Sequence, residues 1–130
     1  MPENKIKVFV VDPLEIWRKV LVNQISDSDD IEVVGEINSG QGAILMIEET
    51  KPDVLLLYAN INDRVRAVDV IDNLRKIDPE IKVILCVDAP QKNEILASVD
   101  HGVNDFITKP YQKQIVLRSI RNSLSRKTGA

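Results

Sequence analysis

The sequence has few of the cysteine and histidine residues that a disulfide-bonded, secreted or metal-dependent protein needs. Its 130 residues include one cysteine, Cys86, one histidine, His101, and five glycines. A single cysteine cannot form an internal disulfide, and a chain of this length buries enough surface to fold without one. A disulfide scaffold is therefore excluded, and a metal site built from cysteine and histidine is not expected.

Charge of one sign and long apolar runs are lacking as well. Lysine and arginine total 17 against 20 aspartate and glutamate, a formal charge of −3. This balance gives no electrostatic reason to expect nucleic acid or an anionic membrane as a partner. No apolar run approaches the length of a membrane span, and the first residues lack the apolar stretch of a signal peptide. We therefore expect a cytoplasmic protein that binds other proteins.

The few glycines do not form a phosphate-binding loop. Neither GxGxxG nor GxxxxGK[ST] occurs, and Ser39-Gly40-Gln41-Gly42 is interpreted as a helix cap or turn. Cys86 lies inside an apolar run, which predicts a buried and unreactive thiol. His101 precedes Gly102 at the predicted end of a helix, where a cationic ring favours the helix dipole. These features argue against an enzyme and against a bound cofactor.

What the sequence does contain is a repeated alternation of short apolar runs and amphipathic segments. Five runs are rich in β-branched residues and nearly continuous, as is typical of parallel strands covered on both faces. They span residues 6–11, 31–35, 54–58, 82–87 and 105–108. Their starts lie 23 to 28 residues apart, which leaves room for one strand, one helix and two loops in each unit.

The segments that follow these runs carry apolar residues at spacings of three and four, which predicts helices. Their markers are Leu14, Trp17, Leu21 and Ile25; Ala43 to Ile47; Val65, Val68, Ile71 and Leu74; Ile95, Leu96 and Val99; and Val116, Leu117, Ile120 and Leu124. With right-handed crossovers this order predicts an α/β fold, a flavodoxin-like (βα)5 doubly wound five-stranded parallel sheet with helices on both faces. No linker divides the chain, so we expect one domain over residues 1–130, with 126–130 as a tail or the start of a linker.

In a doubly wound sheet the site forms at the carboxyl ends of the strands. The residues that follow the apolar runs are Asp12-Pro13, Tyr58 to Asp63, Val87 to Ala89, and Lys109-Pro110. Because one fold of this kind serves many functions, these residues must decide the chemistry.

Four segments of the chain share a pattern with a known family. They are Val10 to Asp12, Ile31 to Glu36, Lys51 to Leu57 and Asp105 to Tyr111. Together they resemble the receiver domain of two-component response regulators, and the Lys109-Pro110 pair is the most specific piece. The resemblance implies transfer of a phosphoryl group from a histidine kinase to an aspartate that ends the third strand. It also implies two acidic residues that hold Mg²⁺, a Ser or Thr ending the fourth strand, and a lysine after the fifth.

The sequence departs from that pattern where the chemistry takes place. Tyr58 stands where the resemblance implies the phosphoaccepting aspartate, and Val87 stands where it implies the hydroxyl. Asp12 is followed by Pro13 rather than by a second carboxylate. A phenol with a pKa near 10 offers no nucleophilic carboxylate at neutral pH, and one carboxylate binds Mg²⁺ weakly or not at all. We therefore expect a degenerate receiver, or pseudo-receiver, in which Lys109 pairs with Asp12 and the Tyr58 hydroxyl is a third hydrogen-bonding member.

The predicted function is a signal-transduction module that acts through protein–protein contacts without phosphorylation. The resemblance places the partner on the fourth helix, fifth strand and fifth helix, or on the first and fifth helices. That partner is a signalling protein, an output domain or a second copy of the chain. The candidate contact residues are Asn93, Glu94, His101, Asp105, Phe106, Tyr111, Lys113, Arg118 and Arg121.

Three alternatives are open from the sequence alone. One is a conventional phosphorelay receiver that accepts phosphate on another residue, such as Asp53 or Asp63, although Asp53 begins its strand at the far end from the pocket. A second is the N-terminal regulatory domain of a longer, DNA-binding regulator. A third is an enzyme or cofactor carrier on the same fold, against which the missing glycine loop argues.

Overall fold

Five parallel strands form a single sheet in the order β2-β1-β3-β4-β5. The structure is a computed structural model that describes residues 4–61, 66–88 and 100–128, with side chains placed as far as Leu124. The strands are β1 (Ile6–Val11), β2 (Ile31–Ile37), β3 (Val54–Tyr58), β4 (Lys82–Asp88) and β5 (Asp105–Lys109). The predicted flavodoxin-like α/β sheet is confirmed, and each strand begins at its predicted residue.

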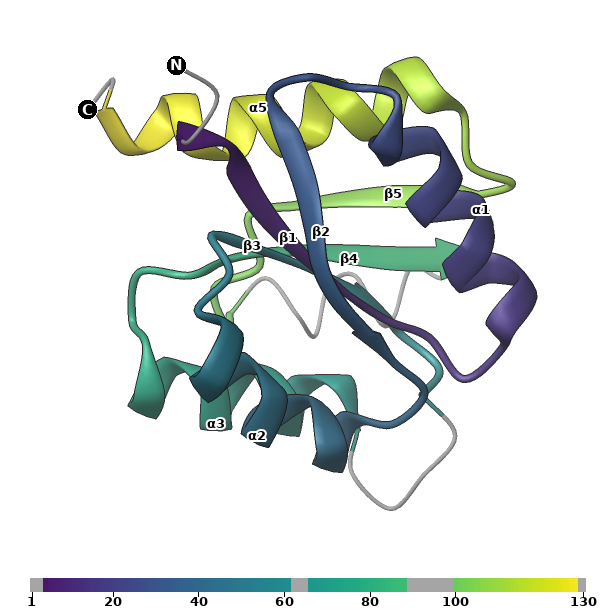
Figure 1. Ribbon diagram of the computed structural model, residues 1–130. Coiled ribbons are helices and arrows are strands. Elements are labelled where there is room, and N and C mark those ends of the chain that lie inside the picture. Colours follow the sequence, from purple (N-terminus) through teal and green to yellow (C-terminus); the bar gives the residue numbers. More distant parts are fainter. Residues whose placement is uncertain (1–3, 62–65, 89–99, 129–130) are drawn as a thin grey trace.

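Helices cover both faces of the sheet (Figure 1). Within the described residues they are α1 (Glu15–Ser26), α2 (Gly40–Thr50), α3 (Ala67–Ile77) and α5 (Lys113–Thr128). α1 and α5 pack on one face, and α2 and α3 pack on the other. The helix predicted from Ile95, Leu96 and Val99 lies outside the described residues. None of the helices in the described part of the chain is long and apolar enough to cross a membrane.

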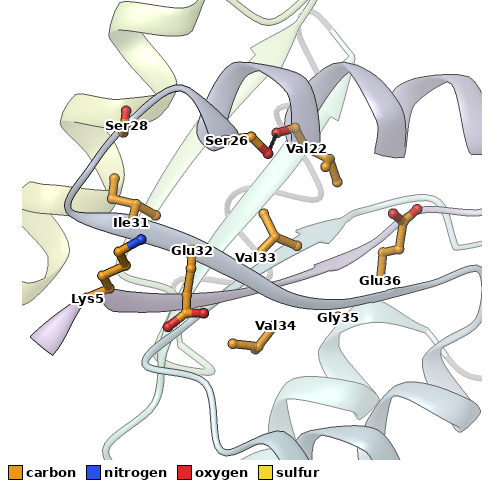
Figure 2. A pocket seen from close by; sticks show the side chains of 10 residues that line it. All are labelled: Lys5, Val22, Ser26, Ser28, Ile31, Glu32, Val33, Val34, Gly35 and Glu36. Atoms are coloured by element: carbon orange, nitrogen blue, oxygen red, sulfur yellow. Dashed lines mark hydrogen bonds between the residues drawn. The ribbon is translucent and has the colours of Figure 1, made fainter. Parts of the chain in front are cut away.

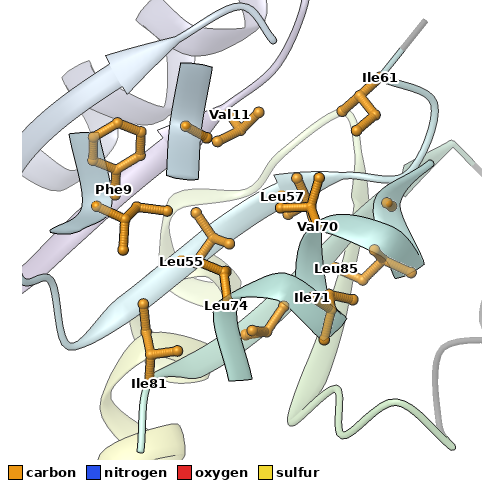
Figure 3. Packing of buried hydrophobic residues seen from close by; sticks show 14 of the residues in the cluster. Phe9, Val11, Leu55, Leu57, Ile61, Val70, Ile71, Leu74, Ile81 and Leu85 are labelled. Carbon is orange, nitrogen blue, oxygen red and sulfur yellow. The ribbon is translucent and has the colours of Figure 1, made fainter. Parts of the chain in front are cut away.

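Alternation along the central strands sends successive side chains to opposite faces and so builds two apolar layers. On the α2 and α3 face, Phe9, Leu55 and Leu85 pack with Ile71 and Leu74 of α3, all fully buried (Figure 3). The layer on the other face includes Val10, Leu56 and Ile84 of the sheet, Leu21 of α1 and Val116 of α5. Because both layers are tightly filled, the ends of the central strands have fixed positions.

The start of α1 differs from the prediction. The apolar spacing placed Leu14 on the buried stripe, but Leu14 is the extended N-cap residue, is 55% exposed, and precedes a helix that begins at Glu15. Its backbone N–H donates to Asp12 Oδ1 at 2.9 Å, so the chain turns tightly between β1 and α1. Leu21 and Ile25, about two and three turns further on, are buried as predicted.

The edge strand β2 contains a bulge that depends on a glycine. Its register with β1 shifts so that Val8 lies opposite Val33 while Phe9 lies opposite Gly35. A Cβ at Gly35 would lie 2.5 Å from Cε2 of the buried Phe9 ring. Glycine is therefore needed here because the ring packs directly against the β2 backbone.

The strand order brings the carboxyl ends of β1, β3, β4 and β5 to one edge of the sheet. Asp12 directly follows β1, and Tyr58 is the last residue of β3. Asp88 and Lys109 are the last residues of β4 and β5. These four residues, with Trp17 of α1, are called the strand-end cluster below.

Candidate functional site

A buried ion pair lies at the centre of the strand-end cluster. The Lys109 ammonium lies 2.9 Å from Asp12 Oδ2, and the two side chains are 5% and 1% exposed. The second carboxylate oxygen, Oδ1, accepts the backbone N–H of Leu14 at 2.9 Å. Removing two charges from water is costly, and close pairing with added hydrogen bonds offsets that cost. The predicted pairing of Lys109 with Asp12 is confirmed as an ion pair, and the other carboxylate oxygen is hydrogen-bonded to the backbone.

Two aromatic rings contact the same ammonium group. Lys109 Nζ lies 3.4 Å from the centre of the Tyr58 ring and 4.7 Å from the centre of the Trp17 ring. The negative face of an aromatic ring attracts a cation, and the attraction is stronger where water is excluded. The lysine is thus held by one carboxylate and two rings that come from β1, β3 and α1.

The Tyr58 hydroxyl does not join the ion pair as the sequence led us to expect. It donates instead to Asp88 Oδ2 at 2.6 Å, so only the ring face of Tyr58 contacts Lys109. The reason is the length of the side chain, because a tyrosine that ends β3 reaches across the ammonium to the neighbouring strand β4. Tyr58 therefore links the ends of β3, β4 and β5.

The Tyr58 hydroxyl is held in its protonated form. Partial burial, and then the hydrogen bond to the Asp88 carboxylate, raise the pKa of Tyr58 from 10.0 to about 12. Both causes penalise a phenolate, the first by removing water and the second by placing a negative charge beside it. At neutral pH this group is a hydrogen-bond donor, and it is neither a nucleophile nor an anionic metal ligand.

The residues around the cluster do not fit a magnesium ion. Mg²⁺ prefers several carboxylate or other oxygen ligands, whereas Asp12 is already paired with Lys109 and Asp88 accepts from Tyr58. Val87 is 1% exposed and packs in the apolar layer beneath. In the described residues no group of three or more histidine, cysteine, aspartate or glutamate side chains is placed to hold a metal.

Tyr111 is a correction to the predicted interaction face. It was expected at the surface beside Lys109-Pro110, but it is only 7% exposed. Its ring packs edge-on against Trp17, with centroids 5.6 Å apart. Cys86 belongs to the same apolar layer, and burial raises the pKa of its thiol to about 12, so the prediction of a buried, unreactive cysteine is confirmed. The prediction for Tyr111 was wrong because its packing partner, Trp17, lies on α1, far away in the sequence.

The other predicted contact residues are divided between internal contacts and exposure. His101 Nδ1 lies 2.6 Å from Asp72 Oδ1 of α3. Asp105 Oδ2 accepts from the buried Ser119 hydroxyl at 2.6 Å. Asn93 and Glu94 lie outside the described residues. His101 and Asp105 therefore link elements of the fold, His101 to α3 and Asp105 to α5.

Two basic residues of α5 are exposed, as predicted, and also pair with acidic residues of the chain. Lys113 Nζ lies 3.0 Å from Asp27, and Arg121 makes two contacts of 2.8 Å with the Asp30 carboxylate. These pairs join α5 to the loop between α1 and β2. Arg118 is exposed, as predicted.

Hollows in the surface lie beside both edge strands. One of about 300 Å³ lies between β5 and α5 and is lined by Phe106 and Ile115, which are 48% and 45% exposed. Another, of about 440 Å³, follows β2 beside α1 (Figure 2). There Arg18 and Lys19 hold the Glu36 carboxylate at 3.0 and 2.8 Å, and the hydrogen bond from Lys19 lowers the pKa of Glu36 most. The β2 hollow contains no member of the strand-end cluster.

Sequence reasoning missed two members of the cluster. Trp17 was assigned only to the buried stripe of a helix, and the direction of the Asp88 side chain was unknown. A signal for Trp17 did exist, because a residue in the first turn of α1 must lie near the end of β1. For Asp88 no such signal exists, since its role depends on the length of the Tyr58 side chain. Asp53, weighed as another acceptor, binds the Lys7 backbone N–H at 2.9 Å at the opposite edge of the sheet, and Asp63 lies outside the described residues.

Comparison with known proteins gives one consistent family. The family model for the response regulator receiver domain matches residues 8–121. The chain is 30% identical to chemotaxis protein CheY of Listeria monocytogenes over 118 residues, which are 91% of this chain and 98% of that protein. It is also similar to the crystal structure of the response regulator domain of Thermotoga maritima CheB, with a TM-score of 0.82 and 26% identity over 93% of this chain and 97% of that one.

Longer relatives match as well. The chain is 33% identical to response regulator protein VraR of Staphylococcus saprophyticus over 118 residues, or 91% of this chain. It spans only about half of that relative, 56% of its length.

Proposed function

Because this chain belongs to the response regulator receiver domain family, we propose that it is a regulatory signalling module whose pocket does not accept a phosphoryl group. Its output is a protein–protein contact made in the cytoplasm, with a signalling protein or an output domain as the partner. It is a pseudo-receiver, with the fold of the family and without the reaction that the resemblance implies.

The observation that carries the proposal is the Tyr58 side chain at the end of β3. Its hydroxyl is bonded to Asp88 and kept protonated, and its ring lies against the Lys109 ammonium. A phosphoryl group needs an anionic oxygen to attack it and free cations to neutralise it. Here the position of the nucleophile holds a phenol, and the lysine is already neutralised by Asp12.

The experiment is exposure to a small phosphodonor. Purified protein is incubated with acetyl phosphate and MgCl₂, and its intact mass is measured at once. We expect no added phosphoryl group. The matched control is the double variant Tyr58→Asp with Pro13→Asp, which supplies an acceptor and a second carboxylate beside Asp12 and is expected to gain one phosphoryl group.

Two results decide between the candidate functions. Addition of one phosphoryl group to the unaltered chain would overturn the proposal and favour a conventional receiver with its acceptor elsewhere, which peptide mapping would locate. No addition to the unaltered chain, with addition to the double variant, supports the pseudo-receiver and shows that the donor and metal were competent.

The partner surface we propose is the apolar hollow between β5 and α5. Phe106 and Ile115 line it and are about half exposed, which is uncommon for large apolar side chains without a partner role when they gather in one place. A second copy of the chain is tested first, by NMR spectra recorded over a range of protein concentrations. Shifts centred on these two residues support this surface, and shifts confined to another face, or none with any candidate partner, contradict it.

A longer regulator that contains this domain is a second candidate. The observation that favours it is the match to VraR, of which the chain spans 56%. In that case an output domain in the same polypeptide is the partner. Sequencing the flanking reading frame tests this, and a stop codon directly after Ala130 would exclude it.

A further inference from the structure

The Tyr58 side chain makes two different contacts from one position. The hydroxyl donates to Asp88 Oδ2 at 2.6 Å, and the ring lies 3.4 Å from Lys109 Nζ. Asp88 and Lys109 are the last residues of neighbouring strands that pair in register, Asp88 opposite Lys109. One side chain from β3 therefore holds the terminal residues of both β4 and β5.

The contacts differ in how much water they exclude. Lys109 is buried and has Asp12 and Trp17 as further neighbours, so its position is fixed from several directions. Asp88 is exposed, and the described β4 ends at this residue. Its bond to a neutral phenol is charge-assisted, and such bonds are shorter and stronger than neutral ones.

From this geometry we propose that Tyr58 is a conformational clamp that holds the carboxyl ends of β4 and β5 in one arrangement. The ring face fixes Lys109, and the hydroxyl fixes Asp88. The clamp is a positioning device, since it acts through the two residues that it contacts. It holds the two strand ends together, and loss of the hydroxyl contact is expected to loosen the Asp88 end while Asp12 and Trp17 still hold Lys109.

This inference rests on the proposed function and deepens it by giving Tyr58 a positioning role in the strand-end cluster. It concerns the mobility of the strand ends and not their chemistry. A failure of the clamp therefore leaves the result of the phosphodonor experiment unchanged, and the two proposals fail separately.

The test is amide hydrogen exchange followed by NMR on the full chain. Tyr58→Phe keeps the ring and removes only the hydroxyl, so exchange is expected to rise roughly three- to tenfold at residues 86–88, as befits the loss of one solvent-exposed hydrogen bond. The Lys109 side-chain resonances are expected to stay in place. Tyr58→Leu removes both contacts, so the rise is expected to include residues 107–109, and the Lys109 resonances are expected to move.

The matched control is Phe106→Leu, which removes an aromatic ring from the same strand as Lys109 without touching the cluster. It is expected to change neither the exchange at residues 86–88 nor the Lys109 resonances. If Tyr58→Phe and Tyr58→Leu raise exchange evenly over the whole sheet, or leave the strand ends unchanged, Tyr58 is only a space-filling residue and the clamp is wrong.

A second measurement covers the case in which Tyr58→Leu does not fold. Exchange at residues 86–87 is compared among Tyr58→Phe, Asp88→Ala and the double variant. A clamp predicts that the increase in the double variant falls short of the product of the two single increases, because both changes break the same bond. Increases that multiply would overturn the proposal.

Discussion

The side chains of the strand-end cluster gather around one group, the Lys109 ammonium. Lys109 is buried to 5% exposure, which without partners would cost several kcal/mol. Asp12 supplies the opposite charge, and the rings of Tyr58 and Trp17 supply polarisable faces in place of water. A neutral tyrosine beside a buried lysine is compatible with this arrangement, whereas a tyrosinate beside Asp12 and Asp88 would add a third negative charge.

At this scale we predict that stability falls at alkaline pH. The folded-state pKa values of Tyr58 and Cys86 are raised from 10.0 and 9.0 to about 12. A raised pKa contributes stability that is fully present below the unfolded-state value and is lost as the pH rises towards the folded-state value. The free energy of unfolding should therefore decline from about pH 9 to about pH 12.

The measurement is urea denaturation at pH 8 and pH 11, with Tyr58→Phe as the comparison. The variant has no phenol to ionise at this position, so its decline is expected to be smaller, although Cys86 and the buried Tyr111 still contribute. An equal decline in the two proteins would contradict the assignment to Tyr58.

Among the elements, α2 shows how one short motif specifies the start of a helix. Ser39 is the extended N-cap residue, and its hydroxyl accepts the backbone N–H of Gly42 at 3.2 Å. The prediction of a cap rather than a phosphate-binding loop at Ser39-Gly40 is thus confirmed. Because α2 lies beside α3 over the Phe9 layer, a loss of the cap is transmitted to the packing of that face.

We predict that Ser39→Ala lowers the free energy of unfolding by about 1 kcal/mol, the usual effect of losing an N-cap side chain. Ser39→Asp, which keeps an acceptor at the cap and adds a charge that favours the helix dipole, is expected to restore the stability. Chemical denaturation of the three proteins measures both effects. Equal stability of Ser39→Ala and the unaltered protein would mean that water replaces the hydroxyl without loss.

For the molecule as a whole, the edge strand β2 pairs with β1 along its length and approaches the core most closely at Gly35. The bulge places Gly35 against the ring of Phe9, a fully buried residue of β1 in the same apolar layer as Ala43 and Ile47 of α2. Surface ion pairs such as Arg121 with Asp30 join the outer elements too, but exposed pairs typically contribute less than about 1 kcal/mol. The fit of the sheet against its apolar layers therefore dominates the stability of the fold.

We predict that Gly35→Ala destabilises the protein by roughly 1 to 3 kcal/mol, the range seen when an extra methyl group is forced into a packed core. The cause is the 2.5 Å separation between the new Cβ and the Phe9 ring. In a Phe9→Leu background the same substitution is expected to cost less, because the ring is absent. Thermal or urea denaturation of the four proteins measures this, and equal costs in both backgrounds would contradict the proposed contact.

By itself the sequence determined the elements and their order. Strand and helix periodicity records which side chains are buried, so the strand starts, the two-faced sheet and the helix stripes followed from it. The pairing of Lys109 with Asp12 also followed, because both residues come at the carboxyl ends of parallel strands, and opposite charges at one edge of the sheet attract. The resemblance to receivers located the strand-end site and singled out Tyr58 as the unusual residue.

Only the tertiary structure decided how the side chains of that site meet. The Tyr58 hydroxyl binds Asp88 rather than the ion pair, Trp17 covers Lys109, and Tyr111 is buried against Trp17. Each of these contacts joins elements that are distant in the chain, and each depends on side-chain length and direction. Local periodicity carries no information about either, because it specifies the face on which a residue lies and not the partner that it reaches.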